Sequence, residues 1–266
     1  MLHTIAHIYG PFTIHSFGLF VVLGLIATIY LTLQHPLRAK IVTKNSFLDA
    51  ILLSIIVGVV GCRILFIFQN WRTLQHYTDI FDVTSGGVSS LGAFVGILLV
   101  MPLYLRWHAI PCIPFFDLLA IHAALLHTFV RIGCFLSGCC HGIQTAMPWG
   151  VIYSDFESSA PLFVRIHPTQ LYSACISLLL FFIIYFKLQY QFKKPGQITA
   201  LYLMGTTMER FLVDFFRGDQ EFLPYTSLLV LSTHQWIALG LFALGFILFI
   251  YASYATTKPY QYHEPV

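Results

Sequence analysis

The chain has 266 residues, of which 58% are apolar and only 9% are charged. A soluble globular domain carries roughly a quarter charged residues, so this composition excludes a soluble protein and indicates an integral membrane protein. The formal net charge of +3 is too small to favour nucleic acid as a partner. The N-terminal residues show no basic region and no small-residue cleavage site, so the first apolar run is expected to remain as a span.

Apolar runs that are long enough to cross the hydrocarbon as helices recur along the whole chain, since a crossing needs about 20 residues. The seven expected spans are 12–33, 47–68, 88–105, 113–130, 168–187, 197–216 and 233–254. No soluble domain fits between them. We therefore predict an all-α integral membrane protein with a single polytopic domain over residues 1–266.

The lysines predict how the spans are oriented. All of them fall in the first or fifth connection or in the tail after the last span. Because cytoplasmic loops carry the excess of Lys and Arg, the N-terminus is expected outside and the C-terminus in the cytoplasm. The longest connection, 138–167, is then external and has room for short re-entrant or amphipathic pieces.

With this orientation, polar residues of four spans fall in the outer leaflet. They are Arg63, Arg131, His167, Gln170, Tyr172, Glu209, Arg210, Asp214 and Arg217. Ionisable groups inside a membrane are costly and usually functional, and the guanidinium fork suits a phosphate. We therefore expect a phospholipid of the outer leaflet as the ligand, although any single arginine could instead be a snorkelling charge at a helix end. Arg210 and Asp214 are four residues apart and are expected to pair.

The stretch 131–142 reads R-I-G-C-F-L-S-G-C-C-H-G and combines an arginine with small residues and thiols. Cys134, Cys139 and Cys140 suit close packing beside glycines. They could also form a reactive thiol site, because Arg131 and His141 would lower a thiol pKa. Zinc ligands are normally spaced C-x2–4-C and adjacent cysteines rarely both reach one ion, so we expect no metal and no cofactor.

Two further histidines lie in the fourth expected span. His122 and His127 are five residues apart and do not share a helix face. We expect them to be core or interface residues without a part in the site.

Several motifs carry a resemblance to a known family, and they extend from Phe17-Gly18 to His234-Gln235. They are G-G-V-S followed by a glycine (86–92), R-I-G-x-F-x-x-G-x-x-x-G (131–142), P-W-G (148–150), H-P-T-Q-L-Y (167–172) and R-F-L-V-D-F-F-R (210–217), with a G-x-R at Gly61 and Arg63. In order and spacing the chain resembles the prolipoprotein diacylglyceryl transferases.

The resemblance implies a seven-helix protein of the bacterial inner membrane. Such an enzyme moves the diacylglyceryl group of phosphatidylglycerol to the thiol of the lipobox cysteine of a preprolipoprotein. Arg131 and Arg210 would then hold the phosphate and the leaving group, with His167 or His141 in the proton role. The remaining substrate-binding residues implied are Arg63, Gly133, Gly138, Gly142, Gln170, Tyr172, Asp214 and Arg217.

Some family positions carry other residues here. Where the family has a histidine followed by two glycines in span three, this chain has Leu91-Gly92-Ala93. The family's asparagine after R-I-G is Cys134 here, and one of its glutamates is Cys139. Two hypotheses follow: a divergent diacylglyceryl transferase, or a paralogous lipid- or thiol-modifying membrane enzyme that uses Cys139 and Cys140. A transporter or receptor is disfavoured, because the charges gather in one leaflet instead of lining a path across the membrane.

Overall fold

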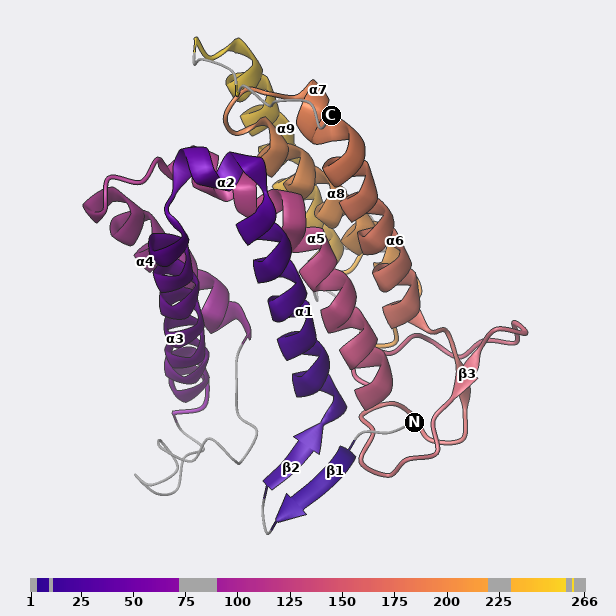
Figure 1. Cartoon of the computed structure of the whole chain (residues 1–266). Coiled ribbons are helices and arrows are strands. Elements are labelled where there is room, and N and C mark those ends of the chain that lie inside the picture. The colour runs from indigo at the N-terminus through magenta and orange to yellow at the C-terminus, as the bar shows by residue number, and fades with distance from the viewer. Residues whose placement is uncertain (1–3, 10–11, 72–89, 220–230, 257–259, 261–266) are drawn as a thin grey trace. The chain divides into compact units, whose positions relative to one another are not determined.

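The computed structural model describes residues 4–9, 12–71, 90–219, 231–256 and 260 and is mostly helical (Figure 1). The chain forms two compact units, one of residues 1–35 with 116–266 and one of residues 36–115. The first unit holds α1 (Ser16–Gln34), α6 (Thr169–Ile183), α7 (Gln189–Gln191), α8 (Gln197–Asp214), α9 (Thr233–Tyr254) and nearly all of α5 (Cys112–Ser137). The second holds α2 (Pro36–Ile41), α3 (Lys44–Gln69) and α4 (Ser90–Trp107).

Five of the helical segments are long and apolar enough to cross a membrane. They are α1, α3, α5, α9 and the continuous run Thr169–Gln191, in which a π-helical turn (η2, Ile184–Leu188) joins α6 to α7. Helix α4 is a shorter apolar helix, and α8 carries the charged residues Glu209, Arg210 and Asp214. The chain is therefore a multi-pass membrane protein, and each of the seven predicted runs contains a helix. The number of crossings and their direction stay predictions.

The first predicted span begins too early. Residues 12–15 form strand β2 (Phe12–His15), which pairs antiparallel with β1 (Thr4–Tyr9), and α1 starts only at Ser16. The pairing satisfies backbone hydrogen-bonding groups that a helix would otherwise satisfy. Hydropathy alone did not distinguish a strand from a helix at residues 12–15, because they directly precede the apolar run of α1.

Helix α5 continues seven residues beyond the predicted end at 130 and therefore includes Arg131 and Cys134. It stops at Ser137 because Gly138 adopts a left-handed conformation with φ of 77°, a common way for a helix to end. A Cβ at Gly133 would lie 3.2 Å from the Phe17 Cα, so the absence of a side chain lets α1 approach α5 closely.

The connection after α5, which has room for short re-entrant or amphipathic pieces, contains two short strands. Strand β3 (Val151–Ile152) pairs antiparallel with β4 (Arg165–Ile166). Buried Tyr153 and Ile166 form a small core there with Ala160. The Tyr153 hydroxyl donates to the Phe135 carbonyl oxygen at 2.8 Å, which ties this connection to the last turns of α5.

Both ends of α8 are anchored by side chains of other elements. At its start, the buried Asp117 carboxylate of α5 accepts from Gly196 N at 2.6 Å, Thr199 N at 2.8 Å and Thr199 Oγ1 at 2.6 Å. A carboxylate there satisfies free N–H groups and complements the helix dipole. At its end, Ser232, the N-cap of α9, donates to Asp214. Since α8 also packs against α6 and α9, its polar face has a defined position.

In the second unit, α3 and α4 make a close backbone contact. A Cβ at Gly92 would lie 2.7 Å from the Gly61 carbonyl carbon, so this crossing requires glycine. The Arg63 guanidinium lies 5.4 Å above the Phe66 ring in the same unit, within cation–π range.

Candidate active site

Three segments of the first unit meet beyond the end of α5. Gly142 N donates to the His167 carbonyl oxygen at 3.2 Å, and Ile143 N donates to the Phe216 carbonyl oxygen at 2.9 Å. A Cβ on Gly142 would lie only 2.8 Å from the Phe216 oxygen and would also collide with His167. The glycine thus lets the loop after α5 pass between the segment before α6 and the segment after α8. The motifs at 131–142, 167–172 and 210–217 are brought together by this contact.

An arginine–carboxylate cluster lies beside this junction and consists of Arg131, Glu209, Arg210, Asp214 and Arg217. The predicted pair is confirmed, with Arg210 Nη2 at 3.3 Å from Asp214 Oδ1. Arg217 Nε lies 3.8 Å from the same oxygen. Arg217 also binds Asp219 bidentately, from Nε to Oδ1 at 2.9 Å and from Nη2 to Oδ2 at 2.6 Å. The Asp214 carboxylate is fully buried, so the cations around it offset the cost of burying its charge.

Arg131 is oriented by a histidine of its own helix. Arg131 Nε donates to His127 Nε2 at 2.9 Å, and His127 Nδ1 lies 3.0 Å from the Ser177 hydroxyl of α6. Because a guanidinium can only donate, His127 accepts at Nε2 and its neutral ring carries its proton on Nδ1. The Nη1 and Nη2 groups of Arg131 make no hydrogen bond to any residue that the structure describes.

Glu209 is the second buried carboxylate of the cluster. The Ser173 hydroxyl of α6 donates to it, and Arg131, Arg210 and Arg217 all lie within electrostatic range. Ser173 follows H-P-T-Q-L-Y directly, so this bond joins the start of α6 to the polar end of α8.

The residues of the H-P-T-Q-L-Y motif meet the P-W-G motif in a short chain of hydrogen bonds. Trp149 Nε1 donates to the Tyr172 hydroxyl at 2.7 Å, and that hydroxyl lies 3.0 Å from His167 Nδ1. The His167 ring packs against Phe216, with 5.3 Å between ring centroids. The imidazole is thus held next to the segment that carries Arg217.

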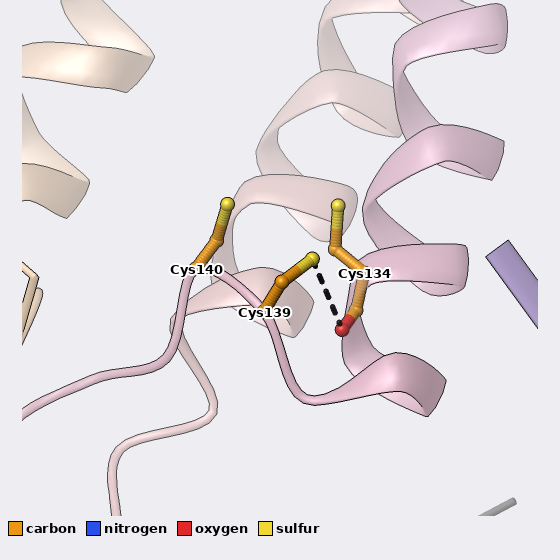
Figure 2. Close-up of side chains that lie close together, drawn as sticks. All are labelled: Cys134, Cys139 and Cys140. Carbon is orange, nitrogen blue, oxygen red and sulfur yellow. Dashed lines mark hydrogen bonds between the residues drawn. The ribbon is translucent and has the colours of Figure 1, made fainter. Parts of the chain in front are cut away.

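The thiol cluster, Cys134 with Cys139 and Cys140, is brought together by the turn after α5 (Figure 2). The three Sγ atoms lie within 4.8 Å of one another. Gln170 Nε2 donates to the Cys139 carbonyl oxygen at 2.7 Å, and Thr169 Oγ1 donates to that of Cys140 at 2.9 Å. Both donors belong to the first turn of α6, which therefore fixes the turn that carries the two thiols.

Cys140 has the electrostatic surroundings of a reactive thiol. Hydrogen bonds from the Cys134 and Cys139 thiols, together with the nearby Arg217 and Arg131 guanidinium groups, hold the pKa of Cys140 well below its usual range. Arg217 also donates a hydrogen bond to this sulfur. The thiol cluster and the arginine–carboxylate cluster are consequently parts of one polar site.

Comparison with known proteins agrees with this arrangement. A family model described as prolipoprotein diacylglyceryl transferase matches residues 3–251. The chain belongs to the prolipoprotein diacylglyceryl transferase family. It is therefore a member of a family of transferases, and the resemblance found in its motifs is confirmed.

Relatives of known name cover most of the chain. A phosphatidylglycerol–prolipoprotein diacylglyceryl transferase of Clostridium tetani is 30% identical over 89% of this chain and 92% of its own length. A transferase of the same name from Clostridium perfringens, numbered 2, is 30% identical over 89% of this chain and 90% of its own length. The enzyme of Bordetella avium is 29% identical over 91% of each chain.

Most of the predicted site residues of this family member lie in the first unit, around the end of α5. His141 is among them, since its carbonyl oxygen accepts from Gly218 N at 3.0 Å and its ring lies beside Gly218. Gly138 terminates α5 next to Ser158. Arg63 belongs to the other unit, so its part in the site stays a prediction.

Two residues have contacts in the site that were not predicted. His127 was expected in the core because it does not share a helix face with His122, whereas the informative spacing is the four residues from His127 to Arg131. Glu209 was expected among the polar residues of the outer leaflet but without a partner, because Ser173 is on another helix.

Proposed function

We propose that this chain transfers the diacylglyceryl group of phosphatidylglycerol to the thiol of a lipobox cysteine in a preprolipoprotein, at the outer leaflet of a bacterial inner membrane. One observation supports it above all. Three arginines from α5, α8 and the segment after α8 surround two buried carboxylates, in a chain of the prolipoprotein diacylglyceryl transferase family. A cationic group of this kind at the end of an apolar helix suits an anionic lipid headgroup.

Arg131 and Arg210 are assigned to the phosphate. The Nη groups of Arg131 have no hydrogen-bond partner in the described part of the chain, and the Arg210 side chain is 24% exposed while it pairs with Asp214. Guanidinium groups held in place before the reaction stabilise charge that develops on a leaving phosphate, and they do so best where water is scarce. The buried carboxylates keep the arginines close together in spite of their mutual repulsion.

The reaction that these groups support is a displacement at the glyceryl carbon. The acceptor sulfur forms a bond to that carbon, the carbon–oxygen bond to the phosphate breaks, and glycerol phosphate leaves with the electron pair. The products are a thioether-linked lipoprotein precursor and glycerol phosphate. His167, held by Tyr172, is assigned to receive the thiol proton, and His141 is the alternative.

The transfer can be measured directly on purified protein. In micelles that contain phosphatidylglycerol labelled in its acyl chains, a lipobox peptide is expected to acquire the label. The same peptide with serine in place of its cysteine is the negative control. A relative such as the Clostridium tetani enzyme serves as the positive control.

Variants identify the residues responsible. Arg131→Ala and Arg210→Ala are expected to lower transfer strongly. Arg38→Ala in α2, whose guanidinium donates to the nearby Val42 carbonyl oxygen, is expected to leave it unchanged. Absence of transfer by the wild-type chain in an assay where the relative is active would contradict the proposal. It would favour the paralogous lipid- or thiol-modifying enzyme.

A further inference from the structure

The feature that the transferase proposal leaves unexplained is the thiol cluster. We propose that Cys134, Cys139 and Cys140 bind one Zn²⁺ ion through their three sulfur atoms, and that the open fourth position takes the acceptor thiol. The second half of this proposal rests on the proposed transferase function, and the first half does not.

The spacing of the sulfur atoms fits a single ion. With zinc–sulfur bonds of about 2.3 Å, sulfur atoms in a tetrahedral site lie roughly 3.8 Å apart. The three Sγ atoms are within 4.8 Å of one another, so small side-chain rotations complete the geometry. Figure 2 shows the sulfur atoms of Cys134 at the helix end and of Cys139 and Cys140 in the turn gathered on one side of the backbone.

The backbone explains how two adjacent cysteines reach the same ion, which their spacing in the sequence argued against. Gly138 has φ of 77° and Cys140 has φ of 56°, so the residues on both sides of Cys139 have left-handed backbone. The left-handed conformation is unfavourable for a residue with a side chain, and residues held in it cluster at functional sites. Gln170 and Thr169 hold the carbonyl groups of Cys139 and Cys140 in this conformation.

The surroundings favour an ion with a free position over a closed structural site. Among the residues that the structure describes, no further histidine, cysteine or carboxylate joins the group of three. Three thiolates and Zn²⁺ carry one net negative charge, which Arg217 and Arg131 next to Cys140 would offset. Cys134 is buried, while Cys139 and Cys140 are only partly buried, so an incoming ligand can reach the ion from their side.

A zinc ion in this place would supply what the chain lacks at Leu91-Gly92-Ala93, where the resemblance led us to expect a histidine. When the acceptor sulfur binds Zn²⁺, it loses its thiol proton to His167, the acceptor assigned above, because a coordinated thiol is deprotonated. The bound sulfur then forms its bond to the glyceryl carbon as the carbon–oxygen bond to phosphate breaks. Glycerol phosphate departs with that electron pair, and the thioether product, a weaker ligand than a thiolate, leaves the metal.

Metal content tests the site independently of activity. Purified wild-type protein is expected to contain zinc in equimolar amount by mass spectrometry, and Co²⁺ in its place should give thiolate-to-metal absorption bands. Cys139→Ser and Cys140→Ser are expected to lose most of the zinc. Cys175→Ser, which changes an exposed cysteine outside the cluster, is the matched control and retains it.

The outcomes separate this inference from the transferase proposal. Equimolar zinc that disappears in the two cluster variants but not in Cys175→Ser supports the site, even if no lipid transfer is found. A wild-type protein that transfers lipid but contains no zinc, or contains copper instead, overturns it. If the variants fold poorly, Zn²⁺ titration of the chelator-treated wild type decides, because a failure to bind the ion there also overturns the site.

The acceptor position has its own test. Addition of lipobox peptide to the Co²⁺-substituted protein is expected to shift the absorption bands as a fourth sulfur binds. The peptide with serine in place of cysteine leaves them unchanged. Equal spectra with both peptides would exclude coordination of the acceptor thiol.

Discussion

The hydrogen bond between His127 and Arg131 leads to a quantitative prediction. In the proposed reaction His127 contacts no substrate group. It acts by holding Nε of Arg131 at 2.9 Å, which leaves the other guanidinium nitrogens to bind the phosphate. His127→Ala removes this bond and leaves Arg131 in place. Arg131→Ala removes the guanidinium together with the bond.

The magnitudes follow from the type of interaction. A hydrogen bond to a charged group contributes about 1.5–3 kcal/mol. If about half of that stabilisation is lost in the transition state, His127→Ala lowers kcat/KM roughly tenfold, since about 1.4 kcal/mol corresponds to a factor of ten. Loss of one donor to a developing charge costs about 100- to 1,000-fold, which is the expected effect of Arg131→Ala.

The decisive measurement is the double variant. Because His127 acts through Arg131, His127→Ala is expected to have no further effect in the Arg131→Ala background, which gives a coupling energy of about 1.4 kcal/mol. Transfer of labelled diacylglyceryl to the lipobox peptide is measured for all four proteins. Thermal unfolding in detergent shows that each of them is folded.

A matched control lies on the same helix. His122→Ala removes another buried imidazole of α5, which contacts Thr32 at 3.1 Å and not an arginine, and it leaves kcat/KM of the folded protein unchanged. Arg131→Lys keeps the charge but loses the fork, so we expect it to recover only part of the activity. Independent, additive effects of His127→Ala and Arg131→Ala would refute the reasoning.

Three other predictions follow from single contacts. Asp117→Ala removes the carboxylate that accepts from the N–H groups at the start of α8, so it is expected to lower the unfolding free energy by about 1–3 kcal/mol. Asp117→Asn should lower it less, and denaturation in detergent measures both. Gly142→Ala would collide with the His167 and Phe216 backbone, so it should lower the unfolding free energy by about 1–3 kcal/mol and abolish most of the activity. Gly240→Ala in α9, with nothing within 4 Å of its Cβ, should not destabilise the protein. Equal effects of the two substitutions would contradict the contact. In metal-free protein the lowered pKa of Cys140 keeps it a thiolate at mildly acidic pH, so iodoacetamide should label it as fast there as at neutral pH. Loss of labelling of Cys140 over that range would refute this.

Interactions between neighbours in the chain were predictable from the sequence. The Arg210–Asp214 pair follows from their spacing of four residues on one helix, and the structure confirms it at 3.3 Å. The same rule applied to His127 and Arg131 would have predicted their hydrogen bond. The end of α5 was harder to place, because hydropathy falls at Arg131 although the helix continues to the left-handed Gly138.

Interactions between distant segments could not be predicted in this way. Ser173 and Glu209 are on different helices, as are His127 and Ser177, and each partner looks unremarkable in the sequence. Asp117 is separated by more than seventy residues from the helix N-terminus that it stabilises. Such pairs depend on how α5, α6 and α8 pack, and no spacing rule reports a distance between helices.

By itself, the sequence determined that this protein lies in a membrane, which family it belongs to and which arginines could hold a phosphate. Composition, apolar run length and motif order carry these conclusions, and none of them requires a distance in space. Only the tertiary structure decided what the cysteines can do. Adjacent thiols point apart in an extended chain, and it is the left-handed turn at Gly138 and Cys140, held by Gln170 and Thr169 of α6, that brings Cys134, Cys139 and Cys140 within reach of one ion.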